Sequence, residues 1–433
     1  MKAILVLVFL AVAGMISLLV TSSNTGLSIA PAVKTISLST PVTVHMNNAH
    51  GVRRVAAYLE QNDARYPVYA ESRASTWILW SRHQPPRSVT FEAGKNRAPN
   101  LKEGKARLVI EAVSNDLRAN TTVNATDVDV VLEAPRVIAD EFQHYVNQGG
   151  MELVTLAPSG SWNDAGVKVG TYTFRSFPLP GKDVNRRFAM FAYPWDLPPD
   201  VKPLVYARNL AGTEATGQFW FKLFPKKYRV RDFELTDALI EKLVNSVDPT
   251  SQVLPGKDVL SRFLYINRTI RLQNNQQLAD LRFKTEQKAL WNGPFIHWGK
   301  EESVFADVRN YIFHGKKVDQ QVHLGFDLSD VKNSPFQAAN DGRVVWAKNL
   351  GIYGNCIVLD HGYGLQSIYG HLREIDIKEG EMVKKGQKMG TSGETGLAGG
   401  VHVHFSMQID GVQVNPREWW DEHWIHDRIM SKL

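Results

Sequence analysis

Five residues near the end of the chain have types and spacings that could bind a metal ion and do chemistry beside it. His323 and Asp327 stand four positions apart, His371 follows, and His402 and His404 form a His-x-His pair. Two histidines and one carboxylate with an open fourth position are the ligand set of a catalytic zinc site. Each pattern alone is common by chance. Their joint occurrence, in this order and between glycine-rich turns, is what points to a metal centre.

The spacing within each pair constrains the backbone. On an extended strand, positions four apart lie about 13 Å from each other, too far for His323 and Asp327 to share one metal ion. Gly325, between them, would let the segment bend so that the two side chains converge. Positions two apart on a strand lie on one face, about 7 Å from each other, so either His402 or His404 can bind metal while the other reaches a water or the substrate.

Two further residues complete this reading of the site. The same strand parity places Tyr369 and His371 on one face, and a facing strand would bring His371 and His402 to opposite sides of one site. Bound Zn²⁺ would bring the pKa of its water near 7, and the histidines outside the ligand set could transfer protons.

Cys356 is the only cysteine, which excludes a closed thiolate site and favours a buried, inert thiol.

Four segments around these residues resemble the lysostaphin-type (β-lytic) zinc metalloendopeptidases of bacterial cell walls. They read HLGFDLSD, LDHGYGLQSIYGHL, VKKGQKMGTSGETGLAGG and HVHFSMQIDGVQVNP, and they cover about a quarter of the chain. The resemblance implies that His323, Asp327 and His404 bind one Zn²⁺. It also implies that His371 and His402 are catalytic, and it leaves open which of them is the general base.

The same resemblance implies a fold and a function for this part of the chain. The fold would be a small, mostly antiparallel β domain with a groove, lined in part by residues 393–400. The function would be zinc-dependent endopeptidase activity on peptide cross-links or stem peptides of peptidoglycan, in cell-wall remodelling. The alternatives are a non-catalytic scaffold that activates another wall hydrolase, and a secreted toxin aimed at a competitor's wall. All five positions are occupied by the expected residue types, which weighs against a scaffold.

The first 24 residues predict a membrane anchor. Lys2 is followed by an unbroken apolar run from Ala3 to Val20, and about 20 apolar residues suffice to cross a bilayer as a helix. No clear small-x-small cleavage site follows, so an uncleaved anchor is favoured over a cleaved signal. We therefore expect a single-pass protein of the inner membrane whose C-terminal ectodomain faces the periplasm or the cell exterior.

The remaining patterns predict a mainly β, multidomain chain with a helical connector. Apolar residues alternate at period two in short runs before residue 230, and "ELTDALIEKLVNSV" places them on one helical face with Thr236 as the N-cap. A second helical stretch is expected over about 258–288, interrupted near "QNNQQ". The expected domains are a β-sandwich-like domain over 34–134, a second β domain over 135–230, the helical connector over 231–291 and the metalloendopeptidase domain over 292–433.

The charge of the chain says little about partners. The formal net charge is +6 over 433 residues, with no block of like charge. This balance gives no indication of nucleic-acid binding and predicts only a weak preference for anionic surroundings. The resemblance implies peptidoglycan peptides as the partner, the predicted anchor implies the inner membrane, and protein partners are unknown.

Overall fold

The computed structural model describes residues 2–21, 24–75, 84–116, 118–329 and 334–433. Strands predominate over helices, so the mainly β fold class is confirmed. The chain divides into two compact units, which are described separately. Unit 1 comprises Met1–Pro135, Gly160–Asn163 and Arg208–Glu214, and unit 2 comprises Arg136–Ser159, Asp164–Ala207 and Ala215–Leu433. The finer domain boundaries drawn from the sequence remain predictions.

The chain begins with helix α1 (Lys2–Thr21). Among the residues that the structure describes, no helix is both long and apolar enough to cross a bilayer, which takes about 20 apolar residues in one helix. The prediction of a single-pass protein held in the inner membrane by residues 1–24 is therefore wrong.

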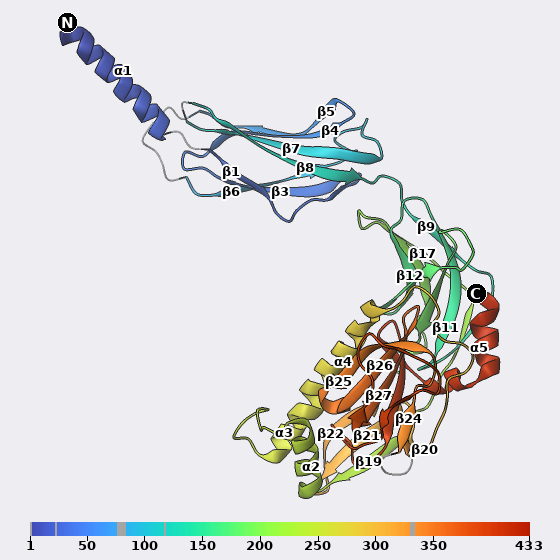
Figure 1. Cartoon of the computed structure of the whole chain (residues 1–433). Helices are drawn as coiled ribbons and strands as arrows, with labels where there is room; N and C mark the ends of the chain where they lie inside the picture. The colour runs from blue at the N-terminus through green and yellow to red at the C-terminus, as the bar shows by residue number, and fades with distance from the viewer. Residues whose placement is uncertain (1, 22–23, 76–83, 117, 330–333) are drawn as a thin grey trace. The chain divides into compact units, whose positions relative to one another are not determined.

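Unit 1 contains two β-sheets with a shared apolar core (Figure 1). In β3, Val42, Val44 and Met46 are buried while the residues between them face outward, as strand alternation requires. The first sheet has the order β1 (Gly26–Ile29), β3 (Thr40–Asn47), β6 (Arg87–Ala93). The second has the order β2 (Thr35–Ile36), β8 (Thr121–Val130), β7 (Gly104–Ser114), β4 (Val52–Gln61), β5 (Ala64–Ser72).

Unit 2 opens with short strands in three sheets. One has the order β14 (Phe177–Pro178), β15 (Arg187–Ala192), β11 (Met151–Ser159), β9 (Arg136–Ala139). The next has the order β13 (Tyr172–Arg175), β12 (Asp164–Val169), β16 (Leu204–Arg208), β17 (Glu214–Gly217), whose last turn passes through residues of unit 1. The third pairs β10 (His144–Asn147) with β18 (Phe221–Phe224) in parallel.

The predicted helices are present after residue 235. Helix α2 (Asp237–Val247) begins at Thr236, whose side chain accepts a hydrogen bond from Leu239 N, so the predicted N-cap is confirmed. The second helical stretch consists of α3 (Val259–Tyr265), the π-helical turn η1 (Ile266–Ile270), α4 (Arg271–Asp280) and the 3-10 turn η2 (Leu281–Lys284). The predicted interruption at "QNNQQ" is wrong, because those residues lie within α4 and the irregular turn comes earlier.

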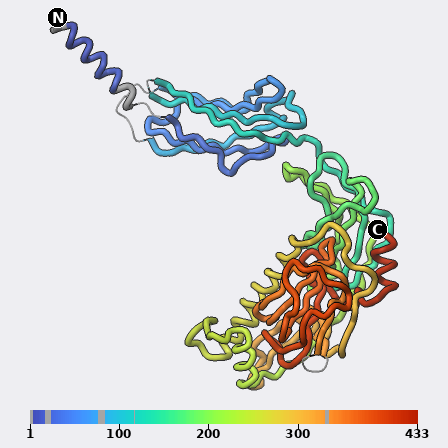
Figure 2. The backbone as a smooth tube through the Cα atoms, in the orientation of Figure 1, coloured from blue at the N-terminus to red at the C-terminus, as the bar shows by residue number. Residues whose placement is uncertain are grey.

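The C-terminal part of unit 2 is built on a large sheet, against which α2, α3 and α4 pack apolar side chains. Figure 2 shows the yellow coils of the helical segment alongside the orange to red trace of the C-terminal part. The sheet has the order β20 (Lys300–Ser303), β23 (Phe326–Ser329), β31 (Val403–Ile409), β27 (Leu365–Leu372), β26 (Asn355–Gly362), β25 (Gly342–Asn349), β29 (Met382–Val383), with β32 (Val412–Val414) beside β31. Two smaller sheets flank it: β19 (Val230–Leu235), β21 (Asp307–Phe313), β22 (Lys316–His323), and β24 (Pro335–Gln337), β30 (Lys388–Thr391), β28 (Glu374–Ile375).

The chain ends in the short helices η4 (Pro416–Trp420), α5 (Glu422–Arg428) and η5 (Met430–Lys432). Trp419 is fully buried and its ring contacts Trp291, Phe295 and Trp424 edge-on. These aromatic contacts hold the terminal segment on the rest of the domain.

Candidate active site

Three neighbouring strands of the large sheet bring the predicted residues together. Asp327 on β23 pairs with His404 on β31, and His404 pairs in turn with Gly370 on β27. Directly opposed residues of adjacent strands share a face, so Asp327 and His404 point to the same side. The glycine at position 370 leaves that side open next to His404.

His323 reaches the same place from the end of β22. The chain turns at residues 324–325 between β22 and β23, so His323 Nε2 lies 2.9 Å from Asp327 Oδ1 and 2.9 Å from His404 Nδ1. The predicted bend at Gly325 is confirmed. A Cβ atom at Gly325 would lie 2.6 Å from His404 Cε1, so glycine is also needed here to make room for that ring.

The converging atoms fit a bound zinc ion. His323 Nε2, Asp327 Oδ1 and His404 Nδ1 all lie within 4.8 Å of one another and their side chains are buried. Tetrahedral ligands at zinc bond lengths stand about 3.3 Å apart, close to the 2.9 to 3.2 Å separations found here. His323 Nδ1 donates to Val304 O at 3.1 Å, which leaves a lone pair on Nε2 directed into the cluster.

Burial and the shared carboxylate set the charge of this cluster. Burial lowers the pKa of His323 to about 4, against the opposing charge of Asp327, and burial also lowers the pKa of His404. Burial would raise the pKa of Asp327, but the charge of His323 and hydrogen bonds from the histidines hold that pKa well below its usual range. Neutral imidazoles and an ionised carboxylate are the protonation states that bind a divalent metal.

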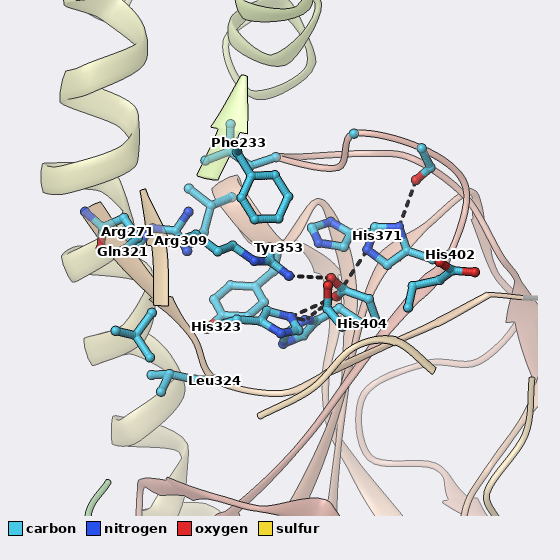
Figure 3. Close-up of a pocket in the computed structure, with 18 of the residues that line it drawn as sticks. Phe233, Arg271, Arg309, Gln321, His323, Leu324, Tyr353, His371, His402 and His404 are labelled. Carbon is cyan, nitrogen blue, oxygen red and sulfur yellow. Dashed lines mark hydrogen bonds and ion pairs between the residues drawn. The ribbon is translucent and has the colours of Figure 1, made fainter. Parts of the chain in front are cut away.

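The other two histidines flank the cluster with one nitrogen each held by the backbone. His371 Nδ1 donates to Thr395 O at 2.8 Å, and His402 Nδ1 donates to Gly400 O at 2.8 Å. The two rings lie 4.9 Å apart between centroids, and His402 Nε2 lies 3.3 Å from Asp327 Oδ1. Figure 3 shows both rings beside the three buried side chains. The fixed Nδ1 atoms leave Nε2 of each ring to face the cavity.

His371 reaches this face by a different route from the predicted one. Its φ of +63° lies in the left-handed region, whereas the preceding Tyr369 pairs with Phe405 and stacks on Trp298 on the opposite side of the sheet. Strand parity between Tyr369 and His371 is therefore broken. The prediction that they share a face was wrong, and Tyr369 has a packing role.

The cluster lines a cavity of about 410 Å³. From the 393–400 segment that was predicted to line a groove, Leu397, Gly399 and Gly400 form part of the wall, and Val401 continues it. Phe233 on β19 and Tyr353 in η3 (Gly351–Tyr353) form other parts, and the Tyr353 ring lies 5.6 Å from that of His404. The lining of the cavity therefore mixes polar side chains, among them the four histidines and Arg309, with apolar ones such as Phe233 and Leu397.

Comparisons with known proteins identify this part of the chain. The family model "Peptidase family M23" matches residues 321–416. Lipoprotein NlpD of Yersinia enterocolitica is 41% identical over 91 residues, which cover 21% of this chain and 93% of that protein. The chain belongs to peptidase family M23.

Two other relatives of the M23 domain carry enzyme names. Peptidoglycan DD-endopeptidase ShyA of Vibrio cholerae is 37% identical over 93 residues, 22% of each chain. DD-carboxypeptidase/endopeptidase Mpg of Neisseria meningitidis is 33% identical over 96 residues, again 22% of each chain. The match spans only about a fifth of the length of these relatives, so it concerns the M23 domain alone.

An ion pair that no sequence motif predicted joins Asp327 to an arginine that precedes the matched region. Arg309 on β21 donates from Nη2 to Asp327 Oδ2 at 2.7 Å, and its guanidinium lies over the Phe233 ring. The only local signal is that Arg309 lies opposite Gln321, two residues before His323, in the β21–β22 pairing. That relationship becomes visible only when the pairing is known.

The remaining histidines near the motifs take no part in the cluster. His361 is fully buried, with Nδ1 at Asp341 O and Nε2 at Ser367 Oγ, and burial lowers its pKa to about 4. His314 is exposed and lies 3.8 Å from Asp237. Cys356 is buried as a free thiol, and burial raises its pKa. The buried, free thiol predicted for Cys356 is therefore confirmed.

Proposed function

We propose that this chain is a zinc-dependent endopeptidase that cleaves peptides of bacterial peptidoglycan. The observation that carries the proposal is the convergence of His323 Nε2, Asp327 Oδ1 and His404 Nδ1 in a cavity that also holds His371 and His402. Membership of the M23 family and the names of ShyA and Mpg support the substrate class.

The proposed roles of the residues follow from their surroundings. Zinc held by His323, Asp327 and His404 would polarise the scissile carbonyl and make a water nucleophilic near neutral pH. His371 and His402 each present Nε2 to the cavity while a backbone carbonyl holds Nδ1–H, so each can take up or deliver one proton at a defined atom. One of them removes the proton from the attacking water, and the other donates to the carbonyl oxygen or to the leaving amine.

The cavity also limits the freedom of the two proton-transfer groups. The main-chain carbonyls of Thr395 and Gly400 belong to the segment that lines the groove, so the same segment that would contact the substrate fixes both imidazoles. Fixing these groups before the substrate binds reduces the reorganisation needed in the transition state.

A second function is supported by a specific observation. NlpD proteins are among the relatives, and NlpD of Salmonella typhimurium, 39% identical over 93 residues, is named a murein hydrolase activator. Under this alternative the domain would bind a second wall hydrolase and cleave nothing itself.

One experiment separates the two functions. The purified full chain, loaded with zinc, is incubated with purified peptidoglycan alone and then together with a second wall hydrolase at limiting concentration. Release of peptide-bond fragments by the chain alone supports the endopeptidase. No release alone, with stimulation of the second hydrolase that persists in His402→Ala, supports the activator.

A further inference from the structure

The cavity of the M23 domain has a wall that the proposed chemistry does not use. Helix α4 begins at Arg271, and Arg271 and Asn275 both line the cavity. Residues four apart lie on the same face of a helix, so this face of α4 is turned toward the metal-binding cluster. Figure 3 labels Arg271, Gln321 and Arg309 among the side chains that line this cavity.

The two arginines that line the described part of the cavity differ in their partners, because one is paired with a carboxylate and the other is not. Arg309 is paired with Asp327 at 2.7 Å, and Glu302 accepts a hydrogen bond from Ser329 at 2.8 Å. Arg271 donates from Nε to Asn267 O at 3.1 Å and from Nη2 to Asn267 Oδ1 at 2.6 Å, both neutral acceptors. Among the described residues that line the cavity, Arg271 is therefore the arginine without a carboxylate partner.

Arg271 is held in place before any ligand binds. Asn267 is fully buried in the π-helical turn η1, and its Nδ2 donates to Asp319 Oδ2 at 2.8 Å, which directs its Oδ1 toward Arg271. These bonds occupy Nε and Nη2 and leave the Nη1 side of the planar guanidinium for another acceptor. A preorganised cation binds an anion with a smaller loss of side-chain entropy than a free one.

Contacts between α4 and the metal-binding cluster give an approximate distance from Arg271 to the place where the scissile peptide bond would lie. Tyr353 donates to Asn275 Oδ1 at 2.9 Å, and its ring lies 5.6 Å from the His404 ring. The wall thus lies on the order of 10 Å from the metal ligands, about three residues of extended peptide.

We propose that Arg271, flanked by Asn275 and Gln321, forms a subsite for a carboxylate of the substrate peptide about three residues from the scissile bond. This inference rests on the proposed peptidase function. The carboxylate belongs either to a side chain or to the free C-terminus of the peptide, and both present the same planar pair of oxygens to a guanidinium.

The test uses three synthetic peptides of one sequence, each spanning the scissile bond. One carries both carboxylates, one has the side-chain carboxylate replaced by its amide, and one has the terminal carboxylate replaced by its amide. Cleavage is measured with the zinc-loaded full chain, and binding of the same peptides is measured with the metal-free chain, where nothing is cleaved. The variants are Arg271→Gln and Arg271→Lys, with Arg373→Gln as a matched change at an exposed arginine that does not line the cavity.

We expect one of the two amides to lower kcat/KM and to weaken binding about 10-fold or more, because a hydrogen bond between two charged groups is roughly twice as strong as one between neutral groups. Arg271→Gln should remove this discrimination mainly through KM, Arg271→Lys should retain part of it, and Arg373→Gln should leave it unchanged. Which amide is discriminated identifies the carboxylate.

Two outcomes would overturn the subsite. Acid and amide peptides could bind the unmodified chain equally well, or the discrimination could survive in an Arg271→Gln protein that keeps normal zinc content and circular dichroism. If no peptide is cleaved, the peptidase function fails, but the binding arm still decides the subsite, so the two failures are distinguishable.

Discussion

Arg309 donates to the carboxylate of Asp327 on the oxygen that faces away from His323. Its Nη2 lies 2.7 Å from Oδ2, while Oδ1 lies 2.9 Å from His323 Nε2. The pair leaves Oδ1 as the single oxygen of Asp327 turned toward His323 and His404, the other two proposed ligands. It also neutralises a buried carboxylate that would otherwise be costly to keep ionised.

Arg309→Met should weaken zinc binding about 10- to 100-fold, as loss of a residue that orients a metal ligand usually does. Without Arg309, Oδ2 of Asp327 would have no partner and the carboxylate could rotate. Because an unpaired buried charge is costly, the carboxylate would also be protonated more readily. Zinc affinity measured by competition with a chromogenic chelator checks this, with Arg309→Lys expected to lie between the two. Equal affinity in Arg309→Met would show that the ion pair does not position Asp327.

The two histidines of the His-x-His pair should behave differently when removed. His404→Ala deletes a proposed ligand atom, so zinc content and peptidase activity should be lost together. His402→Ala should keep about one zinc per chain and lose activity about 10²- to 10⁴-fold, the usual contribution of a general acid or base. Atomic absorption beside a peptide-cleavage assay separates the two effects. Loss of zinc in His402→Ala would contradict the assignment.

Gly325→Ala should displace the His404 ring. The added Cβ would lie 2.6 Å from His404 Cε1 and 2.7 Å from Phe405 O, closer than atoms in proteins approach, so the ring must move. We expect a loss of zinc affinity of about 10-fold or more, by analogy with other changes that misorient a ligand. Gly399→Ala is the control, because a Cβ there meets nothing within 4 Å although Gly399 also lines the cavity.

Glu418 should make the stability of unit 2 depend on pH. It is buried beside Gly150, accepts hydrogen bonds from Asn147 Nδ2 and Met151 N, and burial raises its pKa to about 7. The folded chain then holds this proton more tightly than the unfolded chain, so the stability contributed by the protonated form is complete below about pH 4.5 and is lost as pH rises to about 7. The loss is up to about 3 kcal/mol.

Urea unfolding, followed by tryptophan fluorescence between pH 5 and 8, measures this effect, because Trp419 is buried next to Glu418. The glutamine in Glu418→Gln cannot ionise, so the urea midpoint of this variant should fall less steeply between pH 5 and 8. This holds whatever the substitution does to the stability at any single pH. The same slope in Glu418→Gln and in the unmodified chain would assign the pH dependence to other groups.

The site could be predicted from the sequence to the extent that its geometry is local. The His-x-His pair needs only an extended strand to place both rings on one side, and the His323 to Asp327 spacing needs only a bend at Gly325. The face on which His371 lies relative to Tyr369 could not be predicted, because it depends on the left-handed conformation of His371. Nothing in the types of the neighbouring residues signals that conformation.

The residues around the site arise from contacts between distant segments. Arg309 reaches Asp327 because β21 pairs with β22, and Arg271 reaches the cavity because α4 packs on η3, where Asn274 accepts a hydrogen bond from Ile352 N. An isolated arginine forms no sequence motif, so the sequence alone does not show that Arg309 or Arg271 lies at the site. The β-strands and the capped helix α2 could be predicted because each depends on the order of apolar and polar residues within its own segment.

The central claim is that the M23 domain itself breaks peptide bonds, and mass spectrometry of peptidoglycan fragments tests it most directly. Purified peptidoglycan is incubated with the zinc-loaded full chain and, in parallel, with His402→Ala carrying the same amount of zinc. We predict fragments with newly formed peptide termini from the unmodified chain and none above background from His402→Ala. No fragments from a chain that holds one zinc, or equal fragments from both proteins, would contradict the claim.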